Sequence, residues 1–321
     1  AVNYAGGTDN GDSSGELHYV RVEFAGYATA TDAELNSFTF AAVGSGTQVD
    51  HLQSLYGLDD SFEFFGGAVD AKYLVSYESG DDHFDMSEGY VGRLQHLIAY
   101  QSVRVVPRAA AGSPSSDPQG IENDGCAGSS CLSGQNSQPL TVPMVANFTL
   151  VGTGPGVVDA TSGGVGMMLR RGTGGYYVNG VVARWPRAAA SLRDQTTLDR
   201  SVGGQLVLRN VYFADNGPTF EAQSGSTVQG SLPLAEHALD VATSGTTSAT
   251  LFARLPAAPT TAADLDWALS GNAAARTGGM SAFSGALATR AGGFVLGTSY
   301  RGAADPNGTK WWDGWTAYAR N

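Results

Sequence analysis

Residues 49–100 read VDHLQSLYGLDDSFEFFGGAVDAKYLVSYESGDDHFDMSEGYVGRLQHLIAY. Asp60 recurs as Asp82 after 22 residues, within matching acidic pairs. Phe62 recurs as Phe84 with the same spacing. A period of about 20–25 residues with short strands and no helix is typical of a solenoid, in which each coil buries its apolar face on the next. Equivalent residues then lie about 4.8 Å apart in columns. The repeat therefore predicts an all-β fold, a right-handed parallel β-helix with Phe62 next to Phe84 in its core.

The pattern continues more weakly on both sides of this stretch. Alternating apolar and polar residues predict further strands, at residues 17–24, 37–40, 144–151, 176–183 and 205–213. Residues 108–139 are rich in Gly, Ser and Pro, and we expect a long loop insertion there. Within residues 256–321, Thr260–Leu269 predicts a short capped helix, and WWDGWT follows at 311–316. We expect residues 256–321 to cap an end of a single domain spanning residues 1–321.

Composition limits the classes of function. The net charge is −12 and the basic residues form no stripe, which argues against nucleic acid as a partner. No run of about 18 apolar residues predicts a membrane span. Cys126 and Cys131 lie in a Gly/Ser-rich segment without further zinc ligands, so a local disulfide is favoured over two free thiols. A disulfide implies an oxidising compartment, and we expect a secreted or cell-surface protein whose signal peptide is removed before Ala1.

The acidic residues of the repeat form the candidate site. The predicted register places Asp60 beside Asp82. It also places Glu63 beside Asp85, with Glu122 extending the column in the next coil. Like charges at this spacing repel by ~1 kcal/mol even in water, so a partner should offset them. Ca²⁺ is one candidate partner, because it takes carboxylate and carbonyl oxygens, and its predicted ligands are Asp60, Glu63, Asp82 and Asp85.

Other interpretations of the acidic column remain open. Arg170 or Arg171 could reach over the column and pair with its carboxylates, including Asp124. Alternatively, the carboxylates cap backbone amides of the turns and bind nothing. β-Helix lyases hold Ca²⁺ on acidic residues while an Arg or Lys abstracts a proton, and glycosidases use paired carboxylates. The candidate catalytic residues for either scheme are Asp82, Asp85, Glu122 and Arg170.

Histidines and aromatic residues offer weaker signals. His83 is the one histidine adjacent to the acidic column, and no metal-binding histidine spacing occurs. Four aromatic residues could stack on sugars if they lie at the surface: Tyr90, Tyr100, Trp185 and Trp311. Aromatic ladders inside the core are the alternative explanation for them.

Several motifs follow one another in a distinctive order: DDSFEFFGG at 59–67, DDHFD at 81–85, GIE at 120–122, LRRG at 169–172 and WWDGWT at 311–316. In this order the chain resembles a group of secreted bacterial parallel β-helix proteins, and the resemblance spans most of the chain. It implies the fold and an extracellular or cell-surface location, and it implies no particular activity. The architecture also resembles that of pectate lyases, and a shared fold does not give a shared function.

Three functions follow as hypotheses. The first is a structural or adhesive surface protein that associates with itself, because solenoid ends and edges can build filaments. The second is a β-helix that binds polysaccharide or cleaves it, as a lyase or a glycoside hydrolase, through the acidic column. The third is a module with some other ligand. No complete catalytic motif occurs, so the sequence favours a protein that is not an enzyme.

Overall fold

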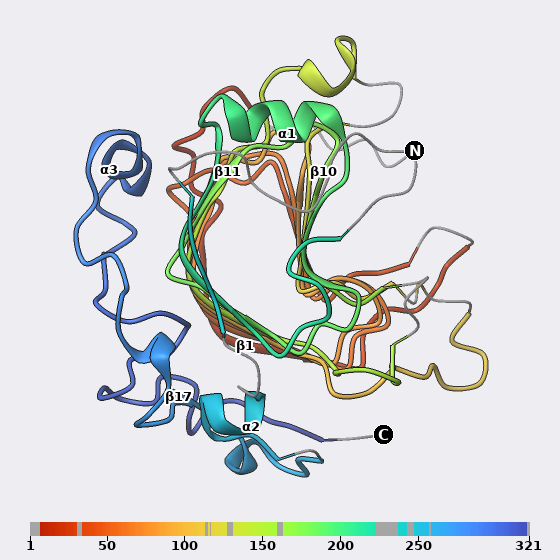
Figure 1. Ribbon diagram of the computed structural model, residues 1–321. Helices are drawn as coiled ribbons and strands as arrows, with labels where there is room; N and C mark the ends of the chain where they lie inside the picture. Colours follow the sequence, from red (N-terminus) through yellow and green to blue (C-terminus); the bar gives the residue numbers. More distant parts are fainter. Residues whose placement is uncertain are drawn as a thin grey trace.

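A computed structural model shows the predicted parallel β-helix, whose stacked coils are seen nearly end-on in Figure 1. It describes residues 7–30, 34–112, 115, 117–126, 131–158, 163–221, 237–242, 247–256 and 258–319. Within these residues the strands form a nine-stranded sheet, a six-stranded sheet and a small two-stranded sheet. Strands of successive coils pair in parallel in the two larger sheets, and their buried faces enclose one long apolar core.

The nine-stranded sheet collects the first strand of each coil. The order runs β1-β3-β5-β7-β9-β11-β14, with β12 pairing both β9 and β14 and β15 lying beside β14. Its strands are β1 (Glu16–Glu23), β3 (Gln48–Leu55), β5 (Asp70–Tyr77), β7 (Arg93–Tyr100), β9 (Met144–Val151), β11 (Gly175–Val178), β12 (Val181–Ala183), β14 (Leu206–Ala214) and β15 (Ala238–Val241). The predicted strand at 176–183 is thus divided into β11 and β12.

The six-stranded sheet carries the aromatic core of the repeat. Its strands are β2 (Phe38–Ala41), β4 (Phe62–Phe65), β6 (Phe84–Ser87), β8 (Ile121–Asp124), β10 (Val165–Arg170) and β13 (Ala188–Leu192). Phe62 lies opposite Phe84 in the ladder, and their rings stack with centroids 5.3 Å apart. Phe38 stacks on the other face of Phe62 at 4.9 Å. The predicted pairing of Phe62 with Phe84 in the core is confirmed.

A column of left-handed residues bends the nine-stranded sheet. Seven successive coils each contribute one residue with φ between 51° and 65° at the same position, and the column comprises Tyr19, His51, Tyr73, His96, Asn147, Asn179 and Asn210. This conformation costs ~1–2 kcal/mol for most residues, and among the residues of this column Asn tolerates it best. Among the first four, stacked rings with centroids 4.4–5.0 Å apart offset part of that cost.

Two elements of the solenoid, β8 and the helix α1 (Gln195–Val202), differ from what the sequence predicted. Ile121–Asp124 lies inside the predicted loop insertion at 108–139, yet it forms β8, because Ile121 is fully buried and the strand pairs with β6 and β10. The helix α1 was not predicted. It begins after Asp194, whose carboxylate accepts a hydrogen bond from the Thr197 amide at 2.8 Å.

The C-terminal region lies along the outer side of the nine-stranded sheet and does not cover an end of the solenoid (Figure 1, blue). Its elements are α2 (Ser248–Leu251), β16 (Phe252–Arg254), β17 (Asp266–Leu269) and α3 (Gly285–Ala291), with 3₁₀ turns at Ala262–Asp264 and Ala274–Arg276. Another 3₁₀ turn, Gly134–Asn136, lies earlier in the chain, outside this region. Buried polar side chains of the sheet hold this region, as Gln53 does by bonding Ala317 and Gln95 by bonding Leu296.

The prediction of a helix at Thr260–Leu269 is wrong. A 3₁₀ turn begins the segment, and β17 then pairs antiparallel with β16. Trp267 explains the difference, because its indole is buried against the sheet and donates a hydrogen bond to the Tyr77 hydroxyl at 2.8 Å. Burial of this large side chain outweighs the weak helix preference of a short segment.

Candidate functional site

The candidate site is an acidic cluster on the outer side of the six-stranded sheet, where β4, β6 and β8 begin. It comprises Asp59, Asp60, Glu63, Asp81, Asp82, Asp85 and Glu122. Side chains alternate along a strand, so Phe62 faces the core while Glu63 faces outward. Parallel register then places Glu63 beside Asp85, and Asp85 beside Glu122. Three successive coils therefore present carboxylates in one column.

A second column forms in the turns before these strands. Asp60 Oδ1 accepts a hydrogen bond from the Asp82 amide at 2.9 Å. Asp82 Oδ1 in turn accepts a hydrogen bond from the backbone amide of Gln119 at 2.8 Å. The side-chain oxygen of Gln119, Oε1, accepts one from the Val165 amide. These side chains therefore cap backbone amides of the next coil. One oxygen of each carboxylate makes this contact, and the other oxygen does not take part in it.

The arginines neutralise only one end of the site. Arg170 pairs with Glu122, and its Nε lies 2.7 Å from Asp124 Oδ1. Arg171 pairs with the other oxygen of Asp124. In the part of the chain that the structure describes, no Lys or Arg forms an ion pair with the four predicted calcium ligands, Asp60, Glu63, Asp82 and Asp85.

Asp85 lies at the centre of the cluster, and one of its two oxygens has no hydrogen-bond partner among the described residues. Its Oδ1 is shielded from water, and no described residue donates a hydrogen bond to it. Its neighbour Glu63 receives a hydrogen bond from the Asn36 amide group. A buried acceptor without a donor costs about 1–3 kcal/mol, and more when it is charged. The position of Asp85 therefore indicates that a group absent from the protein chain belongs beside it.

Burial raises the pKa values of the clustered carboxyl groups, and neighbouring carboxylates raise several of them further. The pKa of Glu63 rises to about 8, although the Asn36 hydrogen bond opposes the shift. The pKa of Asp81 rises to about 7 and that of Glu122 to about 8, mainly through burial. Burial and the charge of Glu122 raise the pKa of Asp85 well above its ordinary range. Without a cation, the site would retain protons near neutral pH.

The spacing of the oxygens suits a large divalent cation. Three overlapping sets each bring one oxygen per residue within 4.8 Å of the others: Asp59, Asp60 and Asp81; Asp60, Glu63 and Asp85; Asp82, Asp85 and Glu122. Ca²⁺ binds oxygens at 2.3–2.6 Å, so two of its ligands can lie up to about 5 Å apart. Asp60 and Asp85 each belong to two sets. The residues present therefore fit Ca²⁺, which would screen the carboxylates from one another.

Asp59 and Asp81 were not among the predicted ligands, although the 22-residue repeat places them in matching positions. Asn36 carried no recognisable signal, because its role depends on a contact with Glu63 between two coils.

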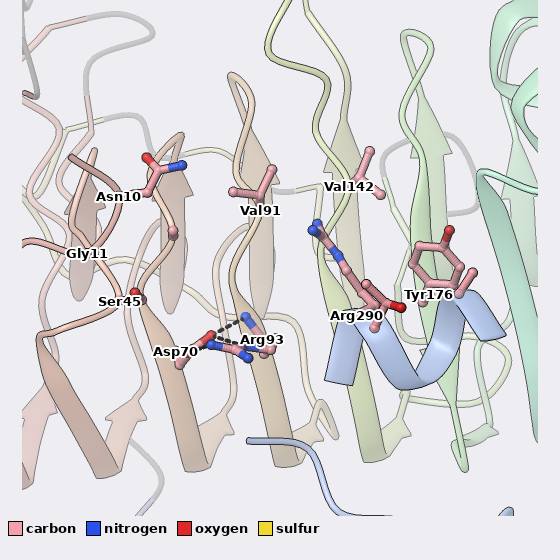
Figure 2. A pocket seen from close by; sticks show the side chains of 12 residues that line it. Asn10, Gly11, Ser45, Asp70, Val91, Arg93, Val142, Tyr176 and Arg290 are labelled. Carbon is pink, nitrogen blue, oxygen red and sulfur yellow. Dashed lines mark hydrogen bonds and ion pairs between the residues drawn. The ribbon is translucent and has the colours of Figure 1, made fainter. Parts of the chain in front are cut away.

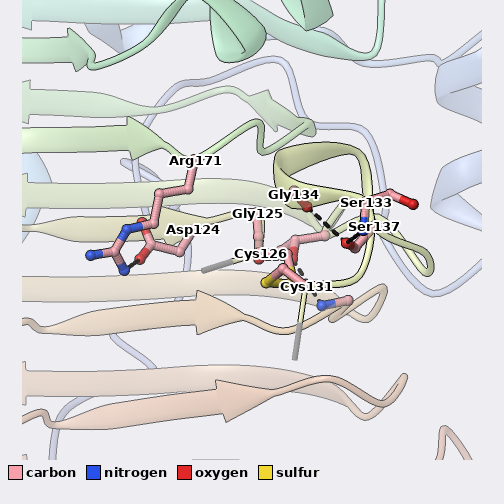
Figure 3. The surroundings of a disulfide bond; sticks show 10 residues. Asp124, Gly125, Cys126, Cys131, Ser133, Gly134, Ser137 and Arg171 are labelled. Carbon is pink, nitrogen blue, oxygen red and sulfur yellow. Dashed lines mark hydrogen bonds and ion pairs between the residues drawn. A yellow bond between two sulfur atoms is a disulfide. The ribbon is translucent and has the colours of Figure 1, made fainter. Parts of the chain in front are cut away.

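The disulfide stabilises the segment that follows β8. Cys126 is bonded to Cys131, as predicted. The Gly125 and Cys126 amides donate hydrogen bonds to the carbonyls of Arg170 and Arg171, and Figure 3 shows the disulfide near the Asp124–Arg171 pair. A short disulfide loop contributes about 2 kcal/mol in the chain-entropy model. It therefore holds the end of β8, the strand that carries Glu122, against β10.

His83 points away from the acidic cluster. Its ring is fully buried, with Nδ1 2.5 Å from Ser76 Oγ, and burial lowers its pKa to about 3. A neutral core histidine of this kind offers no ligand to the cluster.

Of the four aromatic residues considered for stacking on sugars, three lie in the core. Tyr90, Tyr100 and Trp185 are fully buried, and Trp311 packs beside Tyr73 and His96. The alternative of aromatic residues in the core explains the three buried rings.

Fold and site together define a parallel β-helix protein with an external acidic cluster. The chain belongs to the family of pectate-lyase-like β-helix domains, whose model matches residues 1–256. No curated protein and no solved structure matches the chain. None of the helices in the described residues is long and apolar enough to cross a membrane.

Proposed function

We propose that this chain is a secreted or cell-surface β-helix protein that binds an acidic polysaccharide through Ca²⁺ held in the acidic cluster. The observation that carries the proposal is the shielded Oδ1 of Asp85, which receives no hydrogen bond from the described residues and lies among the oxygens of two further coils. The family of pectate-lyase-like domains supports a link to polysaccharide. The Cys126–Cys131 disulfide supports an extracellular location.

The cation explains how an acidic protein could bind an acidic polymer. A chain of net charge −12 repels a polyanion, most strongly at a cluster of carboxylates. Ca²⁺ takes 6–8 oxygen ligands, more than the three oxygens that each set brings together. Carboxylate and hydroxyl oxygens of the polymer can fill the remaining positions, so that the ion bridges protein and ligand.

Binding is better supported than cleavage. Among the candidate catalytic residues, Asp82 caps the Gln119 amide, and Arg170 is paired with Glu122 and Asp124. A base or acid must be able to reach the proton that it transfers, and these contacts engage Arg170 and one oxygen each of Asp82 and Glu122. Asp85 alone is without such a contact among the described residues.

Calorimetric titration tests the cation site. We expect Ca²⁺ to bind the wild-type chain and to bind Asp85→Asn at least tenfold more weakly, because the amide keeps the shape but loses the charge. Asp313→Asn removes an exposed carboxylate elsewhere and should bind Ca²⁺ like the wild type. Polygalacturonate should be retained in Ca²⁺ and released in EDTA. Equal Ca²⁺ affinity in the wild type and Asp85→Asn, or polymer binding that survives EDTA, would refute the proposal.

Self-association is a second candidate function, favoured by the N-terminal coil. Within the described residues, β1 and β2 each pair on one side only. Three large side chains in or after β1 are 40–62% exposed: Tyr19, Phe24 and Tyr27. Sedimentation and electron microscopy of the intact chain test this function, and a monomer at all concentrations would exclude it.

A further inference from the structure

A cavity that is separate from the acidic cluster lies between the coils and α3. It measures about 590 Å³, within the range of small-molecule sites. Figure 2 shows that Val91 and Val142 come from the turns of neighbouring coils, while Tyr176 comes from β11 and Arg290 from α3. None of its lining residues belongs to the acidic cluster.

The charges in this cavity do not balance. Arg93 forms a two-pronged ion pair with Asp70, and its Nε lies 2.8 Å from Asp70 Oδ1. That pair is neutral, and Arg93 also approaches the Ala291 carbonyl at the end of α3. Arg290 remains as an additional positive charge. Its Nε and Nη2 are shielded from water, and no described residue accepts a hydrogen bond from either.

Arg290 lines the cavity, so an anion there could reach the part of its guanidinium that is open to the cavity. Leu287 and Ala291, its neighbours on α3, pack against Met144 and Val178 of the nine-stranded sheet. Figure 2 shows the guanidinium extending from α3 toward Val142, with Tyr176 beside it. A guanidinium without an acceptor is costly when partly buried, and it favours a planar anion because two of its N–H groups point in parallel.

We propose that this cavity binds a small hydroxylated carboxylic acid, with the carboxylate on Arg290. The remaining lining matches such a ligand, because Asn10, Ser45 and Thr289 offer polar groups for hydroxyls and the valines cover its carbon chain. The site is independent of Ca²⁺ and of the polysaccharide proposed for the acidic cluster.

Gluconate and sorbitol provide a matched pair of probes, because they differ at the carboxylate and share the hydroxylated chain. Titrations are done in EDTA, which removes any contribution of Ca²⁺ at the acidic cluster. We expect gluconate to bind and sorbitol not to bind. Arg290→Gln should weaken gluconate binding roughly 10- to 100-fold, the usual loss for a charged hydrogen-bond partner. Arg254→Gln, at an exposed position of β16, should bind like the wild type.

Arg290→Lys keeps the charge and removes the planar pair of donors, so it should also bind more weakly. Melting curves without ligand establish that each variant is folded. Gluconate binding that is unchanged in Arg290→Gln, or absent in the wild type, overturns the proposal. Binding of inorganic phosphate without binding of gluconate also overturns the assignment to a carboxylic acid.

Discussion

The stabilisation that Ca²⁺ gives should depend steeply on pH, because protons and the ion compete for the same carboxylates. The perturbation is a change from pH 8 to pH 6 at constant free Ca²⁺. The size of the effect can be worked out from Glu63, since burial raises its pKa to about 8. Half of its population is ionised at pH 8, and about 1% at pH 6. Competition between protons and Ca²⁺ at this one group therefore weakens the apparent affinity for Ca²⁺ about 50-fold from pH 8 to pH 6.

The free energy follows from mass action. If free Ca²⁺ is 100 times the dissociation constant at pH 8, it stabilises the fold by about 2.7 kcal/mol. After a 50-fold loss of affinity, the same concentration stabilises by about 0.7 kcal/mol. For a chain of this size, about 2 °C of melting temperature corresponds to 1 kcal/mol. The shift caused by Ca²⁺ should therefore fall from about 5 °C at pH 8 to about 1 °C at pH 6.

The metal-free protein should show the opposite trend. A carboxyl group whose pKa is raised by folding favours the folded state below its unfolded pKa, near 4.5 for Glu63, and loses that contribution as the pH rises through about 8. The melting temperature in EDTA should thus decline between pH 5 and pH 8. Differential scanning calorimetry in EDTA and in Ca²⁺ measures both trends. A Ca²⁺ shift of equal size at pH 6 and pH 8 would contradict this reasoning.

Two further predictions concern stability without added ligand. Arg170→Ala should destabilise the fold by ~3 kcal/mol, because it leaves the mostly buried Glu122 without its ion pair and Asp124 with Arg171 alone, whereas Arg171→Ala, at a more exposed pair, should cost less than ~1 kcal/mol; urea denaturation compares them, and equal losses would contradict the assignment. Phe62→Ala should cost ~3–5 kcal/mol by opening a cavity in the stacked aromatic core, and the half-exposed Phe24→Ala should cost less than ~1 kcal/mol in the same assay.

The fold was predictable because the repeat is local and strict. The spacing of 22 residues between the two acidic copies predicts Phe62 beside Phe84, and in parallel strands the same register places Glu63 beside Asp85. Alternation along the strand then assigns one residue to the core and the next to the outside. The acidic column of β4 and β6 therefore followed from spacing alone.

The orientation of His83 and the position of the C-terminal region could not be predicted from the sequence, because both depend on irregular segments. The side chain of His83 lies inside the coil because the turn before β6 breaks the alternation, and a neighbouring serine binds its ring. The C-terminal region follows the sheet because buried Gln53 and Gln95 provide hydrogen bonds to residues more than 200 positions away. Neither pairing has a periodic signature in the sequence.

The limited length of the acidic column argues for a localised site. Parallel register places Thr39 next to Glu63 on one side, and Met168 next to Glu122 on the other. Uncharged residues therefore end the column after three coils, whereas a stripe selected for solubility would gain from continuing along the solenoid. Arg170 balances the Glu122 end, so the excess negative charge is concentrated between Glu63 and Asp85. If the proposed cation binds, we expect it between β4 and β6, where Asp85 Oδ1 has no hydrogen-bond donor among the described residues.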